Sequence, residues 1–356
     1  MSQLKYLVTG GAGFIGSAFV LQSITQNNRK VLNLDKLTYS GNPHNLESVQ
    51  DDPLYSFVQG SIGDRALLAG LLREFKPDAI INFAAESHVD RSIVDPEPFV
   101  RGNVTELCAL LGVTLEWWRD LPAGPKAAFR FLHISTDEVF GSLGPEDPAF
   151  TEATPYAPNS PYSASKAASD HFVRAFHETY GLPALITNCS NNYGPRQFPE
   201  KLIPLLVLNA LSGKALPIYG QGDNIRDWLH VEDHCAAVEL ALQKGRVGQS
   251  YNIGGETELT NLEVVRRVCA VLDKLRPDDA GPYERLIRFV QDRAGHDFRY
   301  AINCAKVKEE LGWSRAWDFE RGLAQTVAWY LDNGPWLEQV QSGEYRNWIS
   351  QYYAGR

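Results

Sequence analysis

The sequence has little that would place the protein in a membrane, in an oxidising compartment or on nucleic acid. No apolar run is long enough to span a bilayer, and the first residues lead into an expected strand without a signal-peptide pattern. The five cysteines are scattered and form no CxxC pair, so we expect reduced thiols in a cytoplasmic protein. The formal net charge of −9 argues against nucleic acid as the main partner.

Candidate metal ligands are also sparse. His230 and His234 are four residues apart, but the residues between them do not make HExxH, and no third ligand is evident. We therefore expect no metal site. The composition, with 44% hydrophobic and 22% charged residues, is ordinary for a globular protein, and 356 residues allow two domains.

A glycine-rich turn follows the first expected strand. Gly10, Gly13 and Gly16 lie between an apolar run and an expected helix, which is typical of a dinucleotide-binding turn. The backbone of such a turn approaches a pyrophosphate, which the helix N-terminus attracts. Asp35 ends a second expected strand at 31–35, about where this fingerprint requires an acid. A carboxylate there would bind a ribose 2′-hydroxyl and repel a 2′-phosphate, so we expect NAD rather than NADP.

Strands and helices alternate through the first half of the chain. Strands are expected at 55–60, 79–85, 129–136 and 184–189, and helices at 65–75, 103–118 and 162–180. This alternation predicts an α/β fold with a doubly wound parallel (Rossmann) sheet. Beyond residue 190, proline and glycine break the chain into short elements, with clear helices at 261–275 and 319–331. We expect an NAD-binding domain at 1–190, to which part of 228–253 returns, and a smaller mixed α/β domain at 191–356.

Two adjacent carboxylates follow the apolar strand at 129–136. Thr136, Asp137 and Glu138 would lie at the carboxyl end of a parallel strand, where such sheets bind their ligands. The two acids are candidates for a general acid and a general base. The alternative is that they cap the following helix. Consecutive residues of a straight strand point to opposite faces, so both acids can reach one ligand only if the strand ends near Thr136.

Tyr162 and Lys166 are four residues apart in an expected helix and therefore lie on one face of it. Beside a nicotinamide, a tyrosinate can take the proton of a hydroxyl whose carbon loses a hydride. Lowering a phenol pKa by about three units needs roughly 4 kcal/mol, which Lys166 and a cationic nicotinamide would supply. Thr136 would hold the same hydroxyl oxygen by a hydrogen bond. Oxidation makes the neighbouring C–H acidic, so the added carboxylates favour elimination of water.

Motifs along nearly the whole chain resemble those of the nucleotide-sugar 4,6-dehydratases of the extended short-chain dehydrogenase/reductase superfamily, above all those that act on dTDP-glucose. The matching segments are 10–16, 35–39, 83–92, 135–141, Tyr162 with Lys166, 188–195, 198–204, 219–220, 225–228 and 292–297. The run Thr136-Asp137-Glu138 is the specific part, because epimerase relatives usually carry a small residue at one of the acidic positions.

The resemblance implies a homodimeric hydro-lyase of deoxysugar biosynthesis that binds NAD and dTDP-glucose. The helices at 103–118 and 162–180 are the expected dimer interface, where they could form a four-helix bundle with their mates. The implied reaction oxidises C4 of the sugar, eliminates water across C5–C6 and returns the hydride to C6. The implied catalytic residues are Thr136, Asp137, Glu138, Tyr162 and Lys166, with Tyr162 acting at C4, Glu138 on the C5 proton and Asp137 on the C6 hydroxyl.

The resemblance also implies two sets of binding residues. NAD contacts are implied for Gly10, Gly13, Phe14, Ile15, Gly16, Asp35, Lys36, Leu37, Thr38, Ser61, Ile62, Ala84, Ala85, Ser87, Tyr162, Lys166 and Asn192. Substrate contacts are implied for Ser87, Thr136, Asn191, Lys201, Leu202, Pro217, Ile218, Tyr219, Arg226, Asn261, Asp292, Arg293 and His296. Because arginine offers a planar fork to phosphate oxygens, Arg226 and Arg293 are the candidate diphosphate ligands.

Three residues depart from the pattern of these dehydratases. Ser61 stands where an aspartate usually reads the adenine amino group, Gly102 replaces a common threonine near the cofactor, and Ala294 replaces a proline of the substrate loop. Two other functions stay open: a nucleotide-sugar 4-epimerase or decarboxylase of the same superfamily, and a non-catalytic NAD-binding sensor. The residues do not distinguish a thymine from a uracil nucleotide.

Overall fold

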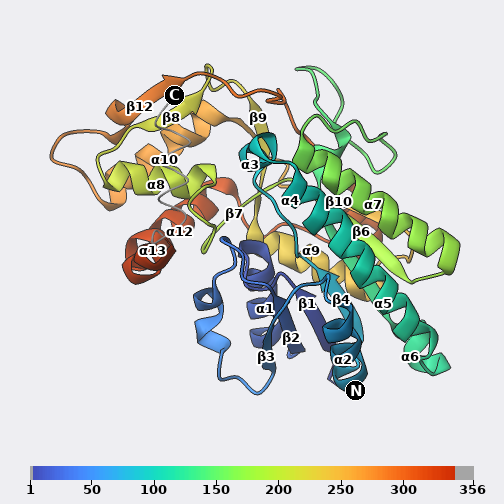
Figure 1. The fold of residues 1–356 in the computed structure, drawn as a ribbon. Coiled ribbons are helices and arrows are strands. Elements are labelled where there is room, and N and C mark those ends of the chain that lie inside the picture. Colours follow the sequence, from blue (N-terminus) through green and yellow to red (C-terminus); the bar gives the residue numbers. More distant parts are fainter. Residues whose placement is uncertain (1–2, 341–356) are drawn as a thin grey trace.

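The computed structural model describes residues 3–340, so the end of the predicted second domain, 341–356, lies outside the described residues. Its main feature is a seven-stranded parallel sheet in the order β10-β6-β5-β4-β1-β2-β3 (Figure 1). The strands are β1 (Lys5–Thr9), β2 (Lys30–Asp35), β3 (Tyr55–Gln59), β4 (Ala79–Asn82), β5 (Arg130–Thr136), β6 (Ala184–Cys189) and β10 (Ser250–Ile253). The strand order reverses beside β1, which confirms the predicted doubly wound α/β fold.

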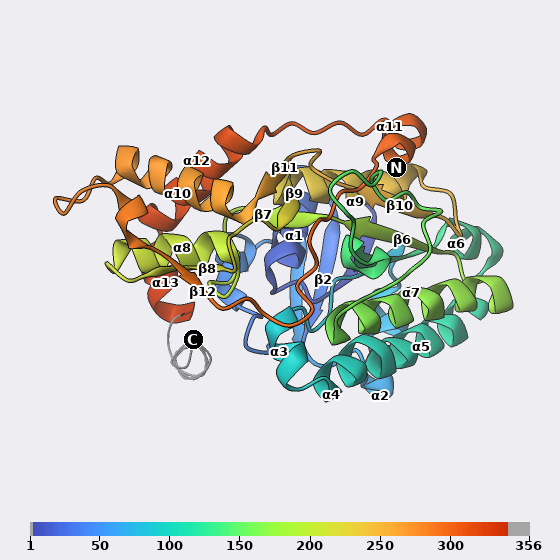
Figure 2. The ribbon, with the colours of Figure 1, turned by 90° about the horizontal axis from the view of Figure 1, so that it is seen from above.

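The two faces of this sheet pack into separate cores. Alternate residues of a strand point to opposite faces, so Tyr6 and Val8 enter one core and Leu7 enters the other. The first face is covered by helices α1 (Phe14–Thr25), α9 (Val231–Lys244) and α11 (Ala305–Leu311). The second is covered by α2 (Arg65–Phe75), α5 (Leu107–Arg119) and α7 (Pro161–Tyr180) (Figure 2). Strand β10 and helix α9 thus join the main sheet from beyond residue 190.

Helix α7, which carries Tyr162 and Lys166, has strong local start and stop signals. The side chain of Ser160 accepts the N–H of Ser163, and the side chain of Ser163 accepts the N–H of Ser160 in return. Proline is the first residue of the helix, and Gly181 ends it with a φ of 73°. These caps fix the first turns of the helix, from which both functional side chains project.

The helix predicted at 103–118 starts earlier in the structure. A π-helical segment at Val100–Glu106 leads directly into α5. The remaining short helices of this part are α3 (Val89–Val94), α4 (Glu97–Phe99) and α6 (Ala123–Ala128), with a 3-10 helix at Pro43–Val49.

The strand predicted at 79–85 is too long, because β4 stops at Asn82. The backbone that follows passes close over the glycine turn. A Cβ atom on Gly10 would lie 2.5 Å from the backbone nitrogen of Ala84. This close approach takes residues 83–85 out of the sheet and over the turn.

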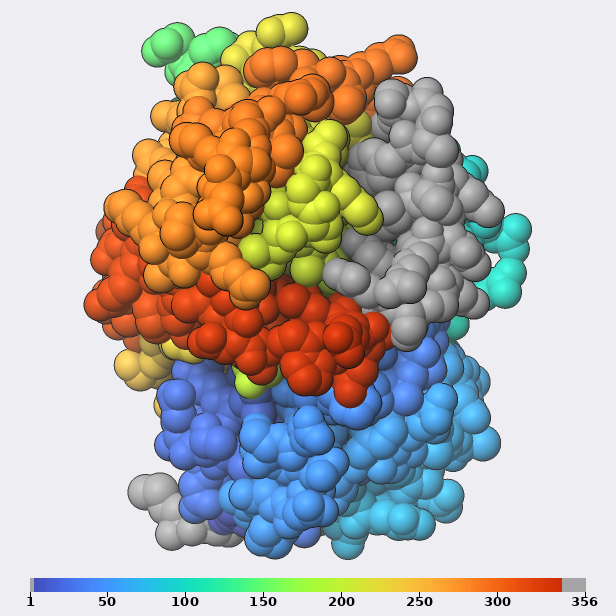
Figure 3. Space-filling view, turned by 90° about the vertical axis from the view of Figure 1, so that its left-hand side faces the viewer, coloured from blue at the N-terminus to red at the C-terminus, as the bar shows by residue number. Residues whose placement is uncertain are grey.

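The second part of the molecule lies against the first, and Figure 3 shows its orange and red segments over the blue N-terminal ones. One small sheet contains β7 (Asn191–Tyr193), β9 (Ile225–His230) and β11 (Glu258–Thr260), and another contains β8 (Leu216–Tyr219) and β12 (Ile287–Val290). The helices are α8 (Leu202–Leu211), α10 (Asn261–Leu275), α12 (Phe319–Asp332) and α13 (Gly334–Val340), with a 3-10 helix at Tyr283–Leu286. The predicted helix at 261–275 is confirmed, and the one at 319–331 extends one residue further.

Two expectations from composition can be compared with this fold. All five cysteines are free, and four of them are buried. Within residues 3–340, no helix combines the length and the apolar character needed to cross a membrane.

Gly16→Ala should destabilise the fold, whereas Gly70→Ala should stabilise it. A Cβ atom at Gly16 would overlap the carbonyl oxygen of Gly10, so we expect a loss of about 1–3 kcal/mol. Gly70 lies inside α2 with no atom within 4 Å of the added carbon, so alanine should gain about 0.5–1 kcal/mol. Free energies of unfolding from urea titrations test both changes, and a neutral Gly16→Ala would contradict the close packing of the turn.

Candidate active site

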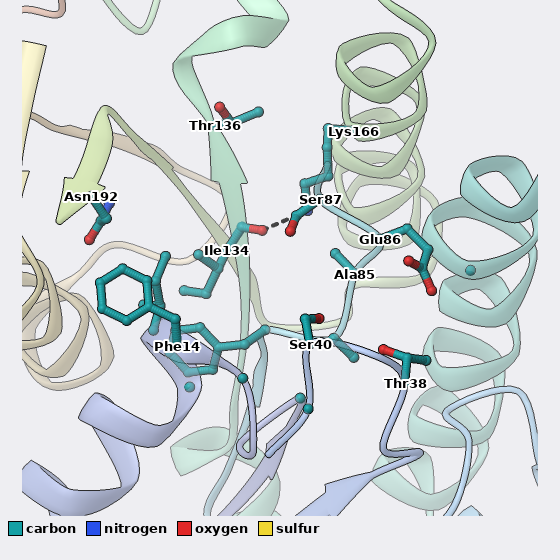
Figure 4. A pocket seen from close by; sticks show the side chains of 18 of the residues that line it. Phe14, Thr38, Ser40, Ala85, Glu86, Ser87, Ile134, Thr136, Lys166 and Asn192 are labelled. Atoms are coloured by element: carbon teal, nitrogen blue, oxygen red, sulfur yellow. Dashed lines mark hydrogen bonds between the residues drawn. The ribbon is translucent and has the colours of Figure 1, made fainter. Parts of the chain in front are cut away.

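One cavity extends from the glycine turn after β1 to the carboxyl ends of β5 and β6 (Figure 4). Its lining residues come mainly from segments 10–16, 34–41, 83–87, 134–138 and 189–201. The helix α1 begins at this cavity, and its N-cap, Gly13, offers no side-chain hydrogen bond to the first N–H groups. Asp35 accepts the N–H of Ala12 at 2.9 Å and the N–H of Leu37 at 2.8 Å. The cavity therefore combines an open helix N-terminus, which favours an anion, with a fixed carboxylate.

Most residues predicted to bind NAD line this cavity. They are Gly10, Gly13, Phe14, Ile15, Gly16, Asp35, Lys36, Thr38, Ile62, Ala84, Ala85, Ser87, Tyr162, Lys166 and Asn192. Two others lie behind the lining, because Leu37 donates its N–H to Asp35 and Ser61 donates its hydroxyl to Glu106. Sequence reasoning missed Glu106, since a single acid inside an expected helix carries no local sign of its tertiary neighbours.

Strand β5 ends at Thr136. Asp137 and Glu138 can reach the same ligand only if the strand ends there. Residues Asp137–Phe140 form a 3-10 turn, and both Asp137 and Glu138 line the cavity. Thr136 caps this turn by accepting the N–H of Glu138 at 3.3 Å. The prediction that the strand ends near Thr136 is confirmed, and the alternative that the carboxylates act as the cap is wrong.

Burial and neighbouring charges separate the two carboxyl groups. The pKa of Asp137 is raised well above its usual range, first by burial and then by the charge of Glu138. Burial also raises the pKa of Glu138, but the positive charges of Arg293 and Lys201 oppose this rise. Among the described residues, Oδ2 of Asp137 is buried without a hydrogen-bond partner. Asp137 is therefore the better proton donor and Glu138 the better proton acceptor.

Tyr162 and Lys166 reach the same cavity from the first turns of α7. Burial raises the pKa of Tyr162 well above its usual range, whereas the Thr136 hydroxyl acts in the opposite direction. The Nζ of Lys166 donates to the carbonyl oxygen of Ile134 at 2.7 Å (Figure 4), and within the described chain it makes no hydrogen bond to Tyr162. Burial thus favours the neutral phenol of Tyr162, and further positive charge in the cavity would favour the tyrosinate.

A buried polar cluster lies behind Lys166 and was missed by sequence reasoning. The Nε2 of His133 is 3.3 Å from Nζ of Lys166 and 3.5 Å from Oδ1 of Asp170. The Oδ2 of Asp170 accepts the hydroxyls of Ser135 at 2.7 Å and Tyr156 at 2.9 Å. Burial lowers the pKa of Lys166, but the charge of Asp170 opposes this shift. The i, i+4 spacing of Lys166 and Asp170 is the sequence signal that could have indicated this pair.

The residues predicted to bind the substrate fall into two groups. Ser87, Thr136, Asn191 and Lys201 line the cavity. The others lie outside its lining, near α8, on β8 and β9, at the start of α10 and in the loop after β12: Leu202, Pro217, Ile218, Tyr219, Arg226, Asn261, Asp292, Arg293 and His296. Ile218 is 2% exposed in the core of the second part, which identifies it as a packing residue in this structure.

The two candidate diphosphate ligands already have partners. Arg226 is buried and donates to three backbone carbonyl oxygens. Arg293 donates to Oδ1 of Asp90 at 2.9 Å. Both guanidinium groups oppose the raised pKa of Glu138, so their charges act on the acid pair. The structure therefore brings the predicted phosphate ligands within electrostatic reach of the predicted proton-transfer residues.

The two histidines that suggested metal ligation have other contacts. His230 caps α9, and Nδ1 of His234 lies 2.9 Å from Oδ1 of Asn192. Across residues 3–340 there is no group of three metal-ligating side chains placed to hold an ion.

The chain is similar to 4,6-dehydratases over nearly its whole length. The family model described as GDP-mannose 4,6 dehydratase matches residues 7–326. A dTDP-glucose 4,6-dehydratase of Xanthomonas campestris pv. campestris is 58% identical over 342 residues, which cover 96% of this chain and 97% of the relative. A dTDP-glucose 4,6-dehydratase of Neisseria meningitidis serogroup B is 54% identical over 345 residues, which cover 96% of this chain and 97% of the relative.

Solved structures with the same fold include both dehydratases and an epimerase. A dTDP-glucose 4,6-dehydratase from Bacillus anthracis in complex with NAD is 48% identical, with a TM-score of 0.83 over 95% of this chain and 99% of the other. A UDP-glucose 4-epimerase from Thermotoga maritima with UDP-glucose is 26% identical, with a TM-score of 0.81 over 92% of this chain and 99% of the other. The fold alone therefore does not separate the two reactions.

Proposed function

We infer that the chain converts dTDP-glucose into dTDP-4-keto-6-deoxyglucose with NAD. The chain belongs to the GDP-mannose 4,6-dehydratase family and within it to the dTDP-glucose 4,6-dehydratases. The observation that carries this inference is the acid pair. Asp137 and Glu138 share one cavity with Tyr162 and Lys166, and their surroundings favour opposite protonation states.

The residues of the cavity fit NAD. The open N-terminus of α1 and the glycine turn would hold the pyrophosphate, and Asp35 would bind the adenosine ribose. Tyr162 and Lys166 would lie at the nicotinamide end. When bound, NAD would supply reversible hydride acceptance, so that the hydride lost at C4 of the sugar could return at C6 and the cofactor would not be consumed.

We assign the first proton transfer to Tyr162. Its phenolate would take the proton of the C4 hydroxyl while the Thr136 hydroxyl holds the same oxygen. Because burial opposes the phenolate, the reaction depends on positive charge from Lys166 and from the bound cofactor. His133 and Asp170 would position the Lys166 side chain from behind.

The elimination step is assigned to the acid pair. Glu138 would take the C5 proton, because nearby arginine and lysine charges favour its carboxylate. Asp137 would donate a proton to the departing C6 hydroxyl, because burial favours its neutral form. As the hydride returns to C6, Glu138 would give a proton back to C5. The proton that Tyr162 gained at C4 would then restore the acid form of Asp137 for the next turnover.

We propose that the two parts of the chain divide the binding. Residues 1–190, together with the part of 228–253 that joins the main sheet, would bind NAD. Residues of 191–340 would bind the nucleotide sugar, with Arg226 and Arg293 on its diphosphate. The other predicted substrate residues belong to the same proposal. The five free thiols support a cytoplasmic location.

The two alternative functions do not account for the acid pair. A 4-epimerase or decarboxylase of the superfamily would use Tyr162 and Lys166 without two acids facing the cavity at the end of β5. A non-catalytic NAD sensor would need none of these four side chains in one cavity. The placement of Asp137 and Glu138 therefore favours dehydration over both.

The function is tested by incubating the protein with dTDP-glucose and a trace of NAD. We expect many turnovers per NAD and a product whose 4-keto-6-deoxy group absorbs ultraviolet light in alkali. Epimerisation would give a hexose nucleotide without this absorbance, and a sensor would give no turnover. A requirement for one NAD per product molecule would contradict a hydride that leaves and returns.

Substitutions of the three proton-transfer residues should stop the reaction at different stages. In heavy water, Glu138→Gln should return substrate without deuterium at C5, because the C5 proton is no longer removed. Asp137→Asn should return substrate with deuterium at C5 but form little product, because water cannot leave. Tyr162→Phe should give neither exchange nor product. Mass spectrometry of recovered substrate measures the exchange, and each change should slow turnover by about 10²–10⁴-fold.

Glu146→Gln is the matched control for these variants, since Glu146 is exposed in the loop after the 3-10 turn. It should keep wild-type turnover. Near wild-type turnover in both Asp137→Asn and Glu138→Gln would rule out the elimination roles assigned here.

We further propose a homodimer that pairs α5 and α7 with their mates. These helices lie side by side in the fold (Figure 2). Val100 is 54% exposed at the start of the π-helical segment that leads into α5, and Phe172 is 41% exposed on α7. Apolar side chains at this exposure on adjacent helices are typical of an interface.

Light scattering during gel filtration tests the dimer. The wild-type protein should elute at twice the mass of one chain, and the double change Val100→Asp with Phe172→Asp should shift it to a monomer. Phe289→Asp is the control, because Phe289 is 54% exposed on β12 in the other part of the molecule. A wild-type monomer at micromolar concentration would refute the proposal.

A further inference from the structure

The cavity lining reaches from the acid pair after β5 to residues that follow β2 and β3, which lie beyond β4 and β1 in the sheet. With a pyrophosphate at the glycine turn and a ribose on Asp35, this end is left for the adenine base. Its lining there includes Lys36, Gly60, Ile62 and Glu106. A purine ring needs an apolar contact for its face and polar partners for its edge. Ile62 supplies the apolar contact for the ring face. The polar partner for the ring edge has to come from the charged side chains.

Glu106 is held in place at this end by two neighbours. It is the last residue of the π-helical segment, and its side chain is 19% exposed. Its Oε2 accepts the hydroxyl of Ser61 at 2.9 Å and the ammonium of Lys36 at 3.4 Å. In the part of the chain that the structure describes, its Oε1 accepts no hydrogen bond. The carboxylate thus has one oxygen fixed by the protein and one available to a ligand.

Ser61 serves as a support for Glu106 rather than as the polar partner itself. Its oxygen already accepts the N–H of Gly63 at 3.0 Å, and its only hydroxyl hydrogen points at Glu106. A hydroxyl used in this way is a weaker acceptor for an amino group than the adjacent carboxylate. The charged acceptor at this end of the cavity therefore comes from the helix that leads into α5, and not from the loop after β3.

We propose that Glu106, oriented by Ser61, accepts a hydrogen bond from the 6-amino group of the adenine of NAD and so selects adenine at this position. The inference rests on the proposed use of NAD. The 6-amino group is a donor, and its contact with a carboxylate is charge-assisted. A 6-oxo purine has an acceptor at the same position. Two acceptors then face each other, and no hydrogen bond can form with the carboxylate. Selection between the two bases should therefore be about 10-fold to 100-fold.

The test compares the binding of NAD with that of nicotinamide hypoxanthine dinucleotide, whose base carries a 6-oxo group. Dissociation constants are measured by calorimetry on the full-length protein without substrate. The wild type should bind NAD at least about 10-fold more tightly than the hypoxanthine analogue. Glu106→Ala should bring this ratio close to one. Glu106→Gln should lower it further, because the amide can donate to the 6-oxo group.

Two further variants make the result specific. Ser61→Ala should reduce the ratio partly, since it removes the donor that orients Glu106. Glu116→Gln is the matched control on the same helix, because Glu116 is exposed and pairs with Arg65 at 2.9 Å. It should leave the ratio unchanged.

Equal binding of the two dinucleotides by the wild type, or an unchanged ratio in Glu106→Ala, would overturn the proposal. A third ligand, NADP, tests whether Glu106 acts instead by neutralising the charge of Lys36. If Glu106→Ala raised only the affinity for NADP, the carboxylate would act by neutralising Lys36, and the proposal would be wrong. The dehydratase assay on the wild type is separate from these measurements, so a failure of the proposed function would be seen there and not in the base selectivity.

Discussion

The end of strand β5 at Thr136 is the constraint on which the rest of the site depends. On a continued strand, Asp137 and Glu138 would point to opposite faces of the sheet, and one of them would enter a hydrophobic core. The 3-10 turn at Asp137–Phe140 brings both to one cavity, and Thr136 stabilises that turn through the N–H of Glu138. A single change in backbone conformation thus brings both acids to one cavity, as the proposed elimination step requires.

The electrostatics of the site are incomplete without the cofactor. Burial raises the pKa values of Tyr162, Asp137 and Glu138, so it favours the neutral form of all three groups. This suits Asp137 as an acid but opposes Tyr162 as a base. Positive charge is supplied to Glu138 by Arg293 and Lys201, whereas the Lys166 ammonium is turned toward Ile134 and His133. In the proposed mechanism, the protein itself therefore supplies the charges that favour a Glu138 carboxylate, whereas a Tyr162 phenolate would depend on a bound cation.

Local signals made much of this site predictable. Residue spacing and backbone chemistry were enough to predict the glycine turn, the role of Asp35 and the helix α7. They also showed that β5 has to end at Thr136. What could not be read from sequence was contact between distant segments. Glu106 meets Ser61 from 45 residues away, and Arg293 meets Asp90 from 203 residues away. The first pair is set by packing within the first part of the molecule and the second by how the two parts pack. None of these residues carries a sequence pattern that reveals its partner.

The pairing of Arg293 with Asp90 has a consequence for how an anion would enter. Asp90 also accepts the hydroxyl of Tyr219 at 3.3 Å, so one carboxylate of α3 holds two predicted substrate residues from the second part of the chain. The guanidinium has therefore already lost much of its water and is held at a set position by a negative charge. A diphosphate that reaches Arg293 exchanges one anion for another, and it does not need to dehydrate a free cation. Binding then becomes a competition between two anions, in which release of Asp90 would loosen the contact between α3 and the loop after β12.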